Sequence, residues 1–391
     1  MTPKERFLAA IAHKLPDRVP VTPDISNYIP CKLTGLPFWD IYFKNDVPLW
    51  KAYLAAASHY GIEGWMASCT NAPLIHEDAP VERTSKCTFV KDRDAMLKRT
   101  VTRTPAGDLT EELTCFRHDP PSPTDKPVKD IARDLKAFFI SQPMPKALDM
   151  PVWNAMRAEC DRRGFAFGVC LSYPGFQNWS WSVQHGVELL AYAEMDTPAL
   201  LEKWCERDTA IGTKTLELVI AAKPDYILFG GSGTITLASP ALARKYAIPA
   251  LAKWSAMARK AGLPTMLHSC GKSRALVQML VEETEVTSVN PLEEPPMGDV
   301  NLAEVKQAFG RKIGLMGNLH TTEVMLRGTP QLVREKAVAA MRAAGHGGGF
   351  VLSSGDQCGY GTPDENLFAL VEAAHTYGTY DQATGALPDL P

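Results

Sequence analysis

The sequence contains no long hydrophobic run and no large excess of charge of either sign. None of its apolar runs approaches the roughly 20 residues that a membrane-spanning helix needs. Its net charge of −3 gives no electrostatic reason to expect nucleic acid or an anionic membrane as a partner. Residues 1–11 mix charges into a helical apolar pattern and lack the apolar core of a signal peptide. We therefore expect a cytoplasmic protein.

Cysteine is present, but without the spacing of a disulfide framework. The nine cysteines are odd in number and scattered along the chain, which favours a reducing compartment. With 391 residues, 45% of them hydrophobic, the chain can bury a large core, and we expect a single domain over residues 1–391.

Helical and strand patterns alternate along most of the chain. Helices are expected near residues 3–12, 49–60, 129–140, 149–163, 185–222, 240–261, 274–283, 302–308, 321–344 and 363–376. Strands are expected near residues 18, 62, 165, 226, 265, 286, 312 and 350. Eight such units are typical of a (β/α)8 TIM barrel, an α/β fold whose catalytic residues lie where strands end. An open doubly wound sheet is the alternative, although it does not require eight units.

Residues 83–118 differ from this rhythm. Alternating stretches flank Pro105-Ala-Gly-Asp, which predicts an antiparallel β-hairpin inserted into the main fold, and residues 120–123, Pro-Pro-Ser-Pro, are expected to close it as a loop. The aromatic segment 28–50 is interpreted either as a packed excursion or as a substrate-lining element.

Two distant stretches share a chemical pattern. His268 and Cys270 are two residues apart at the end of one expected strand, so both point to the same face. Cys358 lies in a polar, glycine-containing loop just beyond the last strand. One nitrogen and two sulfurs suit Zn²⁺ and leave a fourth tetrahedral position open for water or substrate. The alternative is that both cysteines are ordinary core residues.

Further candidates lie in the loops that follow expected strands. Tyr173 and Asn318 are candidate catalytic residues, and Glu293 and Asp356 are candidate fourth ligands or acid–base groups. Candidate substrate-binding residues are Trp179, Trp181 and His320. For each of them a packing, structural or solvated role is the alternative interpretation.

Several motifs resemble the uroporphyrinogen decarboxylase superfamily. They are spread over most of the chain: Thr2-Pro-Lys-Glu-Arg-Phe, Asp17-Arg-Val-Pro-Val, Lys126-Pro-Val-Lys-Asp, Ser239-Pro240, Leu267-His-Ser-Cys-Gly and Leu315-Met-Gly-Asn-Leu. The decarboxylases proper carry a basic loop after the first strand and an Asp after the second. Here residues 23–30 and 65–70 occupy those places without the arginines or the Asp, so a substrate with several carboxylates would lose its clamps.

The His-x-Cys motif with a distant Cys is similar to the corrinoid-dependent methyltransferase branch of that superfamily. His268, Cys270 and Cys358 match it one by one. The resemblance implies zinc as a cofactor and cobalamin carried by a partner corrinoid protein, since nothing in the chain resembles a cobalamin-binding domain. We expect demethylation of a methoxylated aromatic donor, because tryptophan and tyrosine in segments 28–50 and 173–181 could cover an apolar ring. A thiol-methylating enzyme, a zinc-free decarboxylase and a barrel with a structural zinc are the alternatives.

Overall fold

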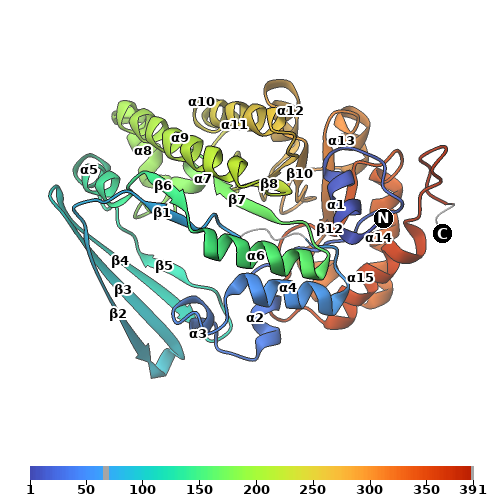
Figure 1. The fold of residues 1–391 in the computed structure, drawn as a ribbon, viewed down its shortest axis with the longest axis horizontal. Helices are drawn as coiled ribbons and strands as arrows, with labels where there is room; N and C mark the ends of the chain where they lie inside the picture. Colours follow the sequence, from blue (N-terminus) through green and yellow to red (C-terminus); the bar gives the residue numbers. More distant parts are fainter. Residues whose placement is uncertain (65–69, 389–391) are drawn as a thin grey trace.

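The computed structural model describes residues 1–64 and 70–388, and its centre is a six-stranded parallel sheet (Figure 1). The order β12-β11-β10-β9-β8-β7 follows the sequence, so each strand pairs with its neighbour along the chain. These strands are β7 (Gly168–Ser172), β8 (Tyr226–Gly230), β9 (Thr265–His268), β10 (Ser288–Asn290), β11 (Gly314–Leu319) and β12 (Phe350–Ser354). Six of the eight expected strands are therefore confirmed.

The first expected strand lies beside β12 without forming a regular strand. Residues 18–22 form isolated bridges instead of a regular strand, because Pro20 and Pro23 have no N–H to donate to a ladder. Thr22 N still donates to Leu352 O at 2.9 Å, and Glu63 N donates to Val21 O at 3.1 Å. The second expected strand, over residues 62–68, falls largely outside the described residues. The sheet is thus consistent with a TIM barrel, and a closed ring is not shown by the described residues.

Helices connect the strands and cover the sheet (Figure 1). Several begin at a capping side chain, as where Ser239 Oγ accepts from Leu242 N at 3.2 Å before Pro240. Their bounds are α1 (Pro3–Ile11), α2 (Tyr28–Thr34), α3 (Phe38–Tyr42), α4 (Leu49–Tyr60), α5 (Ile131–Ser141), α6 (Met150–Arg163), α7 (Phe176–Trp179), α8 (Val187–Asp196), α9 (Pro198–Ala221), α10 (Pro240–Tyr246), α11 (Ile248–Lys260), α12 (Arg274–Glu283), α13 (Leu302–Phe309), a π-helical turn (Thr321–Leu326), α14 (Pro330–Ala344) and α15 (Asp364–Tyr377).

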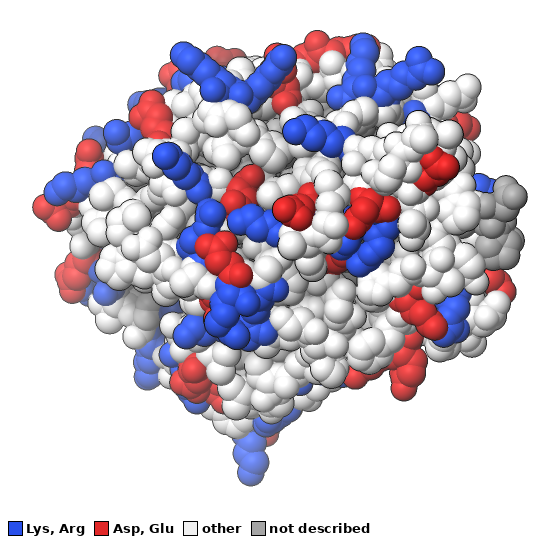
Figure 2. All heavy atoms as spheres, turned by 45° about the vertical axis from the view of Figure 1, so that its right-hand side comes forward, with Lys and Arg blue, Asp and Glu red and all other residues white. Residues whose placement is uncertain are grey.

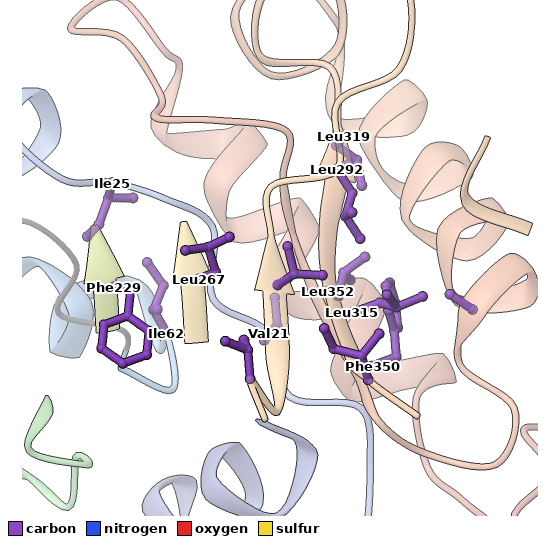
Figure 3. Close-up of a cluster of buried hydrophobic side chains, with 14 of the residues drawn as sticks. Val21, Ile25, Ile62, Phe229, Leu267, Leu292, Leu315, Leu319, Phe350 and Leu352 are labelled. Atoms are coloured by element: carbon purple, nitrogen blue, oxygen red, sulfur yellow. The ribbon is translucent and has the colours of Figure 1, made fainter. Parts of the chain in front are cut away.

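Alternation along the strands divides the core in two. Leu228, Met266 and Met316 cluster with Phe7 and Ile11 of α1, and Phe7 packs edge-on against Tyr226 with ring centroids 5.5 Å apart. The intervening side chains join the larger core that the connecting helices cover, part of which is drawn in Figure 3 with Phe229, Leu267, Leu315 and Leu352. Helix α1 therefore covers one end of the inner face, and His268 and Asn318, two positions beyond Met266 and Met316, lie toward the other end.

The insertion is larger than a hairpin. It is a four-stranded antiparallel sheet in the order β2-β3-β4-β5, formed by β2 (Glu82–Val90), β3 (Ala95–Thr104), β4 (Gly107–Phe116) and β5 (Ser122–Asp125), with a 3-10 turn (Lys91–Arg93) between β2 and β3. The expected loop at residues 120–123 is thus partly wrong, because β5 is an edge strand and its Pro123 does not interrupt an inner ladder. The short antiparallel pair β1 (Leu74–His76) and β6 (Pro145–Leu148) was not foreseen from the sequence.

The surface agrees with the small net charge. Figure 2 shows lysine and arginine intermingled with aspartate and glutamate over one face of the molecule. Among the described residues, no helix is both long and apolar enough to cross a membrane.

Candidate metal site at the carboxyl ends of the strands

Three side chains meet where β9 and β12 end. One potential ligand atom from each of His268, Cys270 and Asp356 lies within 4.8 Å of those of the other two. His268 Nε2 and Cys270 Sγ are 3.1 Å apart. Two ligands on one tetrahedral zinc ion are separated by about 3.5 Å, so small side-chain adjustments suffice to place this set on one ion.

The local sequence explains why two of these residues face each other. His268 is the last residue of β9 and lies two positions after the inward-facing Met266, so it points to the same inner face. The chain then turns at Gly271, whose φ of +81° is a left-handed conformation, and an added Cβ would meet Thr236 Oγ1 at 2.4 Å. Ser232 Oγ lies 3.6 Å from Cys270 Sγ.

The electrostatics of this site suit a cation. Burial raises the pKa of the Cys270 thiol well above its usual value, and the nearby charges of Asp356 and Glu293 add to that shift. Burial also raises the pKa of Glu293 to about 7, with Asp356 as a further cause, while a hydrogen bond from Gly271 N opposes it. Of the described residues, no lysine or arginine is among the main causes of these two pKa shifts. A divalent cation would supply the missing positive charge and favour the ionised ligands.

Asp24 is a buried carboxylate that the sequence did not single out as a site residue. Burial, followed by the charge of Asp356, raises the pKa of Asp24 to about 6, while the imidazole of His268 lowers it. Its backbone is tied to the loop after β12, because Asp24 N donates to Ser354 Oγ at 3.0 Å and Asp24 O accepts from Cys358 N at 2.7 Å. Only its position after the first strand could have drawn attention to it.

Cys358, the third expected ligand, lies two residues beyond Asp356 and is fully buried. Burial raises the pKa of its thiol to about 12, and the charges of Asp24 and Asp356 act in the same direction. The thiol is thus beside the site, but Asp356 and not Cys358 completes the compact group. Zinc ligation by Cys358 stays a prediction.

Tyr173 and Asn318 form hydrogen bonds to residues of neighbouring loops. Tyr173 Oη lies 2.6 Å from Thr234 Oγ1, which in turn lies 2.8 Å from Ser269 Oγ, directly before Cys270. Asn318 Nδ2 donates to Leu292 O at 3.1 Å, next to Glu293. These contacts support the loops around the ligands, and a direct catalytic role for either residue stays a prediction.

The three expected substrate-binding residues do not come together. Trp179 is 1% exposed, and its Nε1 donates to Asp208 Oδ2 of α9 at 2.8 Å. Trp181 is 60% exposed and lines a surface hollow beside β3 and α5. His320 Nδ1 accepts from Thr322 N and Glu323 N at 3.2 Å, which caps the π-helical turn. Trp179 is the last residue of the helical turn α7 and Trp181 lies in the turn that follows, so the two side chains do not share a face as they would on a strand.

The aromatic segment 28–42 does lie next to the site loop. Tyr42 Oη donates to Asn27 Oδ1 at 2.7 Å, and Asn27 Nδ2 donates to Gln357 Oε1 at 3.1 Å. Phe38 packs against Tyr360 with ring centroids 6.0 Å apart. Residues 65–70, the other place where the decarboxylase pattern is missing, fall outside the described residues apart from Thr70.

Part of the chain is similar in sequence to a known protein family. Residues 184–377 match the family model for uroporphyrinogen decarboxylase (URO-D). The Uroporphyrinogen decarboxylase of Anaeromyxobacter dehalogenans (strain 2CP-C) is 28% identical over 137 residues, which are 34% of this chain and 36% of that protein. The Uroporphyrinogen decarboxylase of Anaeromyxobacter sp. (strain Fw109-5) is 26% identical over 266 residues, 64% of this chain and 70% of that protein. The chain thus spans about a third of the first relative's length.

The fold is shared over nearly the whole chain with a solved structure. A methyltransferase from Methanosarcina mazei superposes with a TM-score of 0.67 at 19% identity, covering 96% of this chain and 99% of that one. At this identity the likeness establishes the fold, a URO-D-like α/β architecture.

Proposed function

We propose that this protein is a zinc-dependent methyltransferase that exchanges a methyl group between a methylated small molecule and a corrinoid cofactor carried by a partner protein. The observation that carries the proposal is the convergence of His268, Cys270 and Asp356 at the carboxyl ends of two strands of a URO-D-like fold. In this fold class, catalytic groups lie at that end of the sheet.

The donor set fits zinc in an open site. An imidazole, a thiolate and a carboxylate are all zinc ligands, and three protein ligands leave one position free. When bound there, zinc would act as a Lewis acid that polarises a donor oxygen or holds a thiol as thiolate near neutral pH. The chain's own residues orient the ligands: Ser269, through Thr234 and Tyr173, fixes the loop after β9, and Asp24 fixes the loop after β12.

A methoxylated aromatic is the methyl donor that we favour. Tyr42, Phe38 and Tyr360 form an aromatic cluster beside the loop that carries Asp356, which supports an aromatic donor near the site. Trp179 and Trp181 no longer support this choice, because they lie elsewhere. A thiol acceptor is the first alternative, since zinc in the same site would serve it equally well.

A decarboxylase is the second alternative, and the family match is the observation that favours it. The site argues against a substrate with several carboxylates. Asp24, Glu293 and Asp356 already place negative charge there, and residues 23–30 carry no arginine to bind such a substrate.

Metal analysis and methyl exchange test the proposal together. Purified protein should hold about one zinc per chain, and Cys270→Ala or Asp356→Ala should lower the zinc content while the protein stays folded. Cys87→Ala, at an exposed cysteine of β2, is the matched control and should keep its zinc. Cys358→Ala will decide whether that thiol is a ligand or only packs beside the site.

The transfer itself can be followed in the corrinoid spectrum. Incubation with cob(I)alamin and a methoxylated aromatic should produce methylcobalamin, whereas incubation of methylcobalamin with a thiol tests the reverse type of transfer. If zinc is bound at the site but no methyl exchange occurs with any donor or thiol, the methyltransferase proposal fails and the metal site stands.

A further inference from the structure

Asn290 is the last residue of β10 and lies beside the candidate metal ligand His268. The two are register partners on adjacent parallel strands, and Ser269 N donates to Asn290 O at 2.9 Å. Register partners on parallel strands point their side chains to the same face, and adjacent strands lie about 4.8 Å apart. Val289, one position earlier, packs in the larger core under the connecting helices, which places Asn290 on the inner face. The amide and the imidazole are therefore neighbours on one face of the sheet.

The amide of Asn290 is buried without a hydrogen-bond partner. It is 1% exposed, and neither Oδ1 nor Nδ2 has a donor or acceptor among the described residues. Burial of such a group destabilises a protein, because the amide has given up its hydrogen bonds to water. Unpartnered buried groups are rare in native proteins, and each one calls for a specific explanation.

The orientation of His268 indicates what this amide binds. Nε2 of His268 faces the candidate metal ligands, since it lies 3.1 Å from Cys270 Sγ. A histidine that binds a metal through Nε2 carries its proton on Nδ1, and in most metal sites an acceptor holds that N–H. The Oδ1 atom of Asn290 is an acceptor of this kind, and it belongs to the strand directly beside β9.

We propose that Asn290 is a positioning residue for the metal site. Its Oδ1, directly or through one buried water, accepts from the Nδ1–H of His268 when a metal ion is bound at Nε2. This bond fixes the tautomer and the orientation of the imidazole and so strengthens zinc binding. The inner face of the sheet thus keeps a polar group that lowers the stability of the metal-free protein. The inference rests on the metal site of the proposed function and is independent of the methyl donor.

Zinc affinity and thermal stability of Asn290→Leu should change in opposite directions. Leucine is similar in size but has no acceptor, so zinc binding by the full-length protein, measured by chelator competition, should weaken by about tenfold or more. The thermal midpoint of the metal-free variant should rise by about 1–4 °C, because an apolar group replaces an unpartnered amide. Asn290→Asp keeps an acceptor and should bind zinc at least as tightly as the wild type. Asn290→Ala gives the same zinc test if the leucine variant does not fold.

Ser288→Ala is the matched control. It removes another buried, unpartnered polar group from the same face of β10, but the register partner of Ser288 on β9 is Met266 and not a metal ligand. Its zinc affinity should equal that of the wild type. If Asn290→Leu binds zinc as tightly as the wild type, or loses zinc affinity and thermal stability together, the inference is overturned while the metal site stands. If the wild type binds no zinc, the inference fails together with the metal site of the proposed function.

Discussion

Replacement of the buried Glu63 by glutamine should destabilise the protein markedly. Glu63 is 2% exposed, and its Oε1 contacts Arg6 of α1 and accepts from Arg18 Nη2 at 2.6 Å. Its Oε2 accepts from Val21 N at 3.2 Å. Glutamine has one acceptor oxygen instead of two, so its amide would face either the two arginines or the Val21 N–H, donor against donor.

The size of the expected loss of stability follows from the burial of Glu63 and its partners. Burial raises the pKa of Glu63 and outweighs the opposing effect of Arg18 and Arg6, so the network as a whole gains little over apolar packing. Removing Glu63 is different, because the Arg6 side chain, 8% exposed, would keep its charge and lose one of its two carboxylate partners, while Asp17 Oδ1 still accepts from Arg6 Nε at 2.6 Å. Breaking a buried pair costs about 3–5 kcal/mol, and the retained Asp17 pair and glutamine oxygen place this loss at the lower end, about 3 kcal/mol.

Thermal and denaturant-induced unfolding will measure the effect. A chain of 391 residues has an unfolding entropy of about 0.8 kcal/mol/K, so a loss of 3 kcal/mol corresponds to about 4 °C in midpoint. Glu323→Gln is the control, because its bond to Arg327 at 2.9 Å is exposed on both sides and should contribute less than about 1 kcal/mol. If Glu63→Gln and Glu323→Gln unfold together, the reasoning about the buried carboxylate of Glu63 is refuted.

Two further predictions concern buried carboxylates. The raised pKa of Asp208 means that its contribution to stability is fully present below about pH 4 and is lost as pH rises through about 6. In paired unfolding curves, the free energy of unfolding of Asp208→Asn should therefore rise by about 2 kcal/mol relative to that of the wild type between pH 4 and pH 7. A difference that stays constant with pH would contradict this. Asp24→Asn should weaken zinc binding by about tenfold in chelator competition, because a buried negative charge beside the ligands is removed. Asp92→Asn, on an exposed turn, is the control and should bind zinc as the wild type does; equal zinc affinities of Asp24→Asn and the wild type would contradict the prediction.

Local signals explain what the sequence predicted well. Six of the eight expected strands were recognised from short apolar runs, each of which needs only a few neighbouring residues. The meeting of His268 and Cys270 followed from strand alternation, which is also local. Both inferences need only a few neighbouring residues.

Long-range packing explains what the sequence did not reveal. Asp24 approaches the site only because its segment is bridged to the loop after β12, a contact across more than 300 residues. The direction of Trp179 depends on Asp208, which lies on another helix. Neither partner leaves a signature in the spacing of residues, so these two side chains could not be placed from the sequence.

The charge at the carboxyl ends of the strands affects which substrates a protein of this fold can bind. The pattern of the URO-D family extends over residues 184–377, yet Asp24, Glu293 and Asp356 bring three carboxylates to the ends of the strands. A polyanionic substrate would add repulsion to this group, in which burial already raises the pKa of Asp24 and of Glu293. A divalent cation reverses that balance, because the same groups then become ligands and neighbours of positive charge. This balance of charge supports the proposed metal-assisted chemistry on a neutral donor, while the scaffold is compatible with other chemistries.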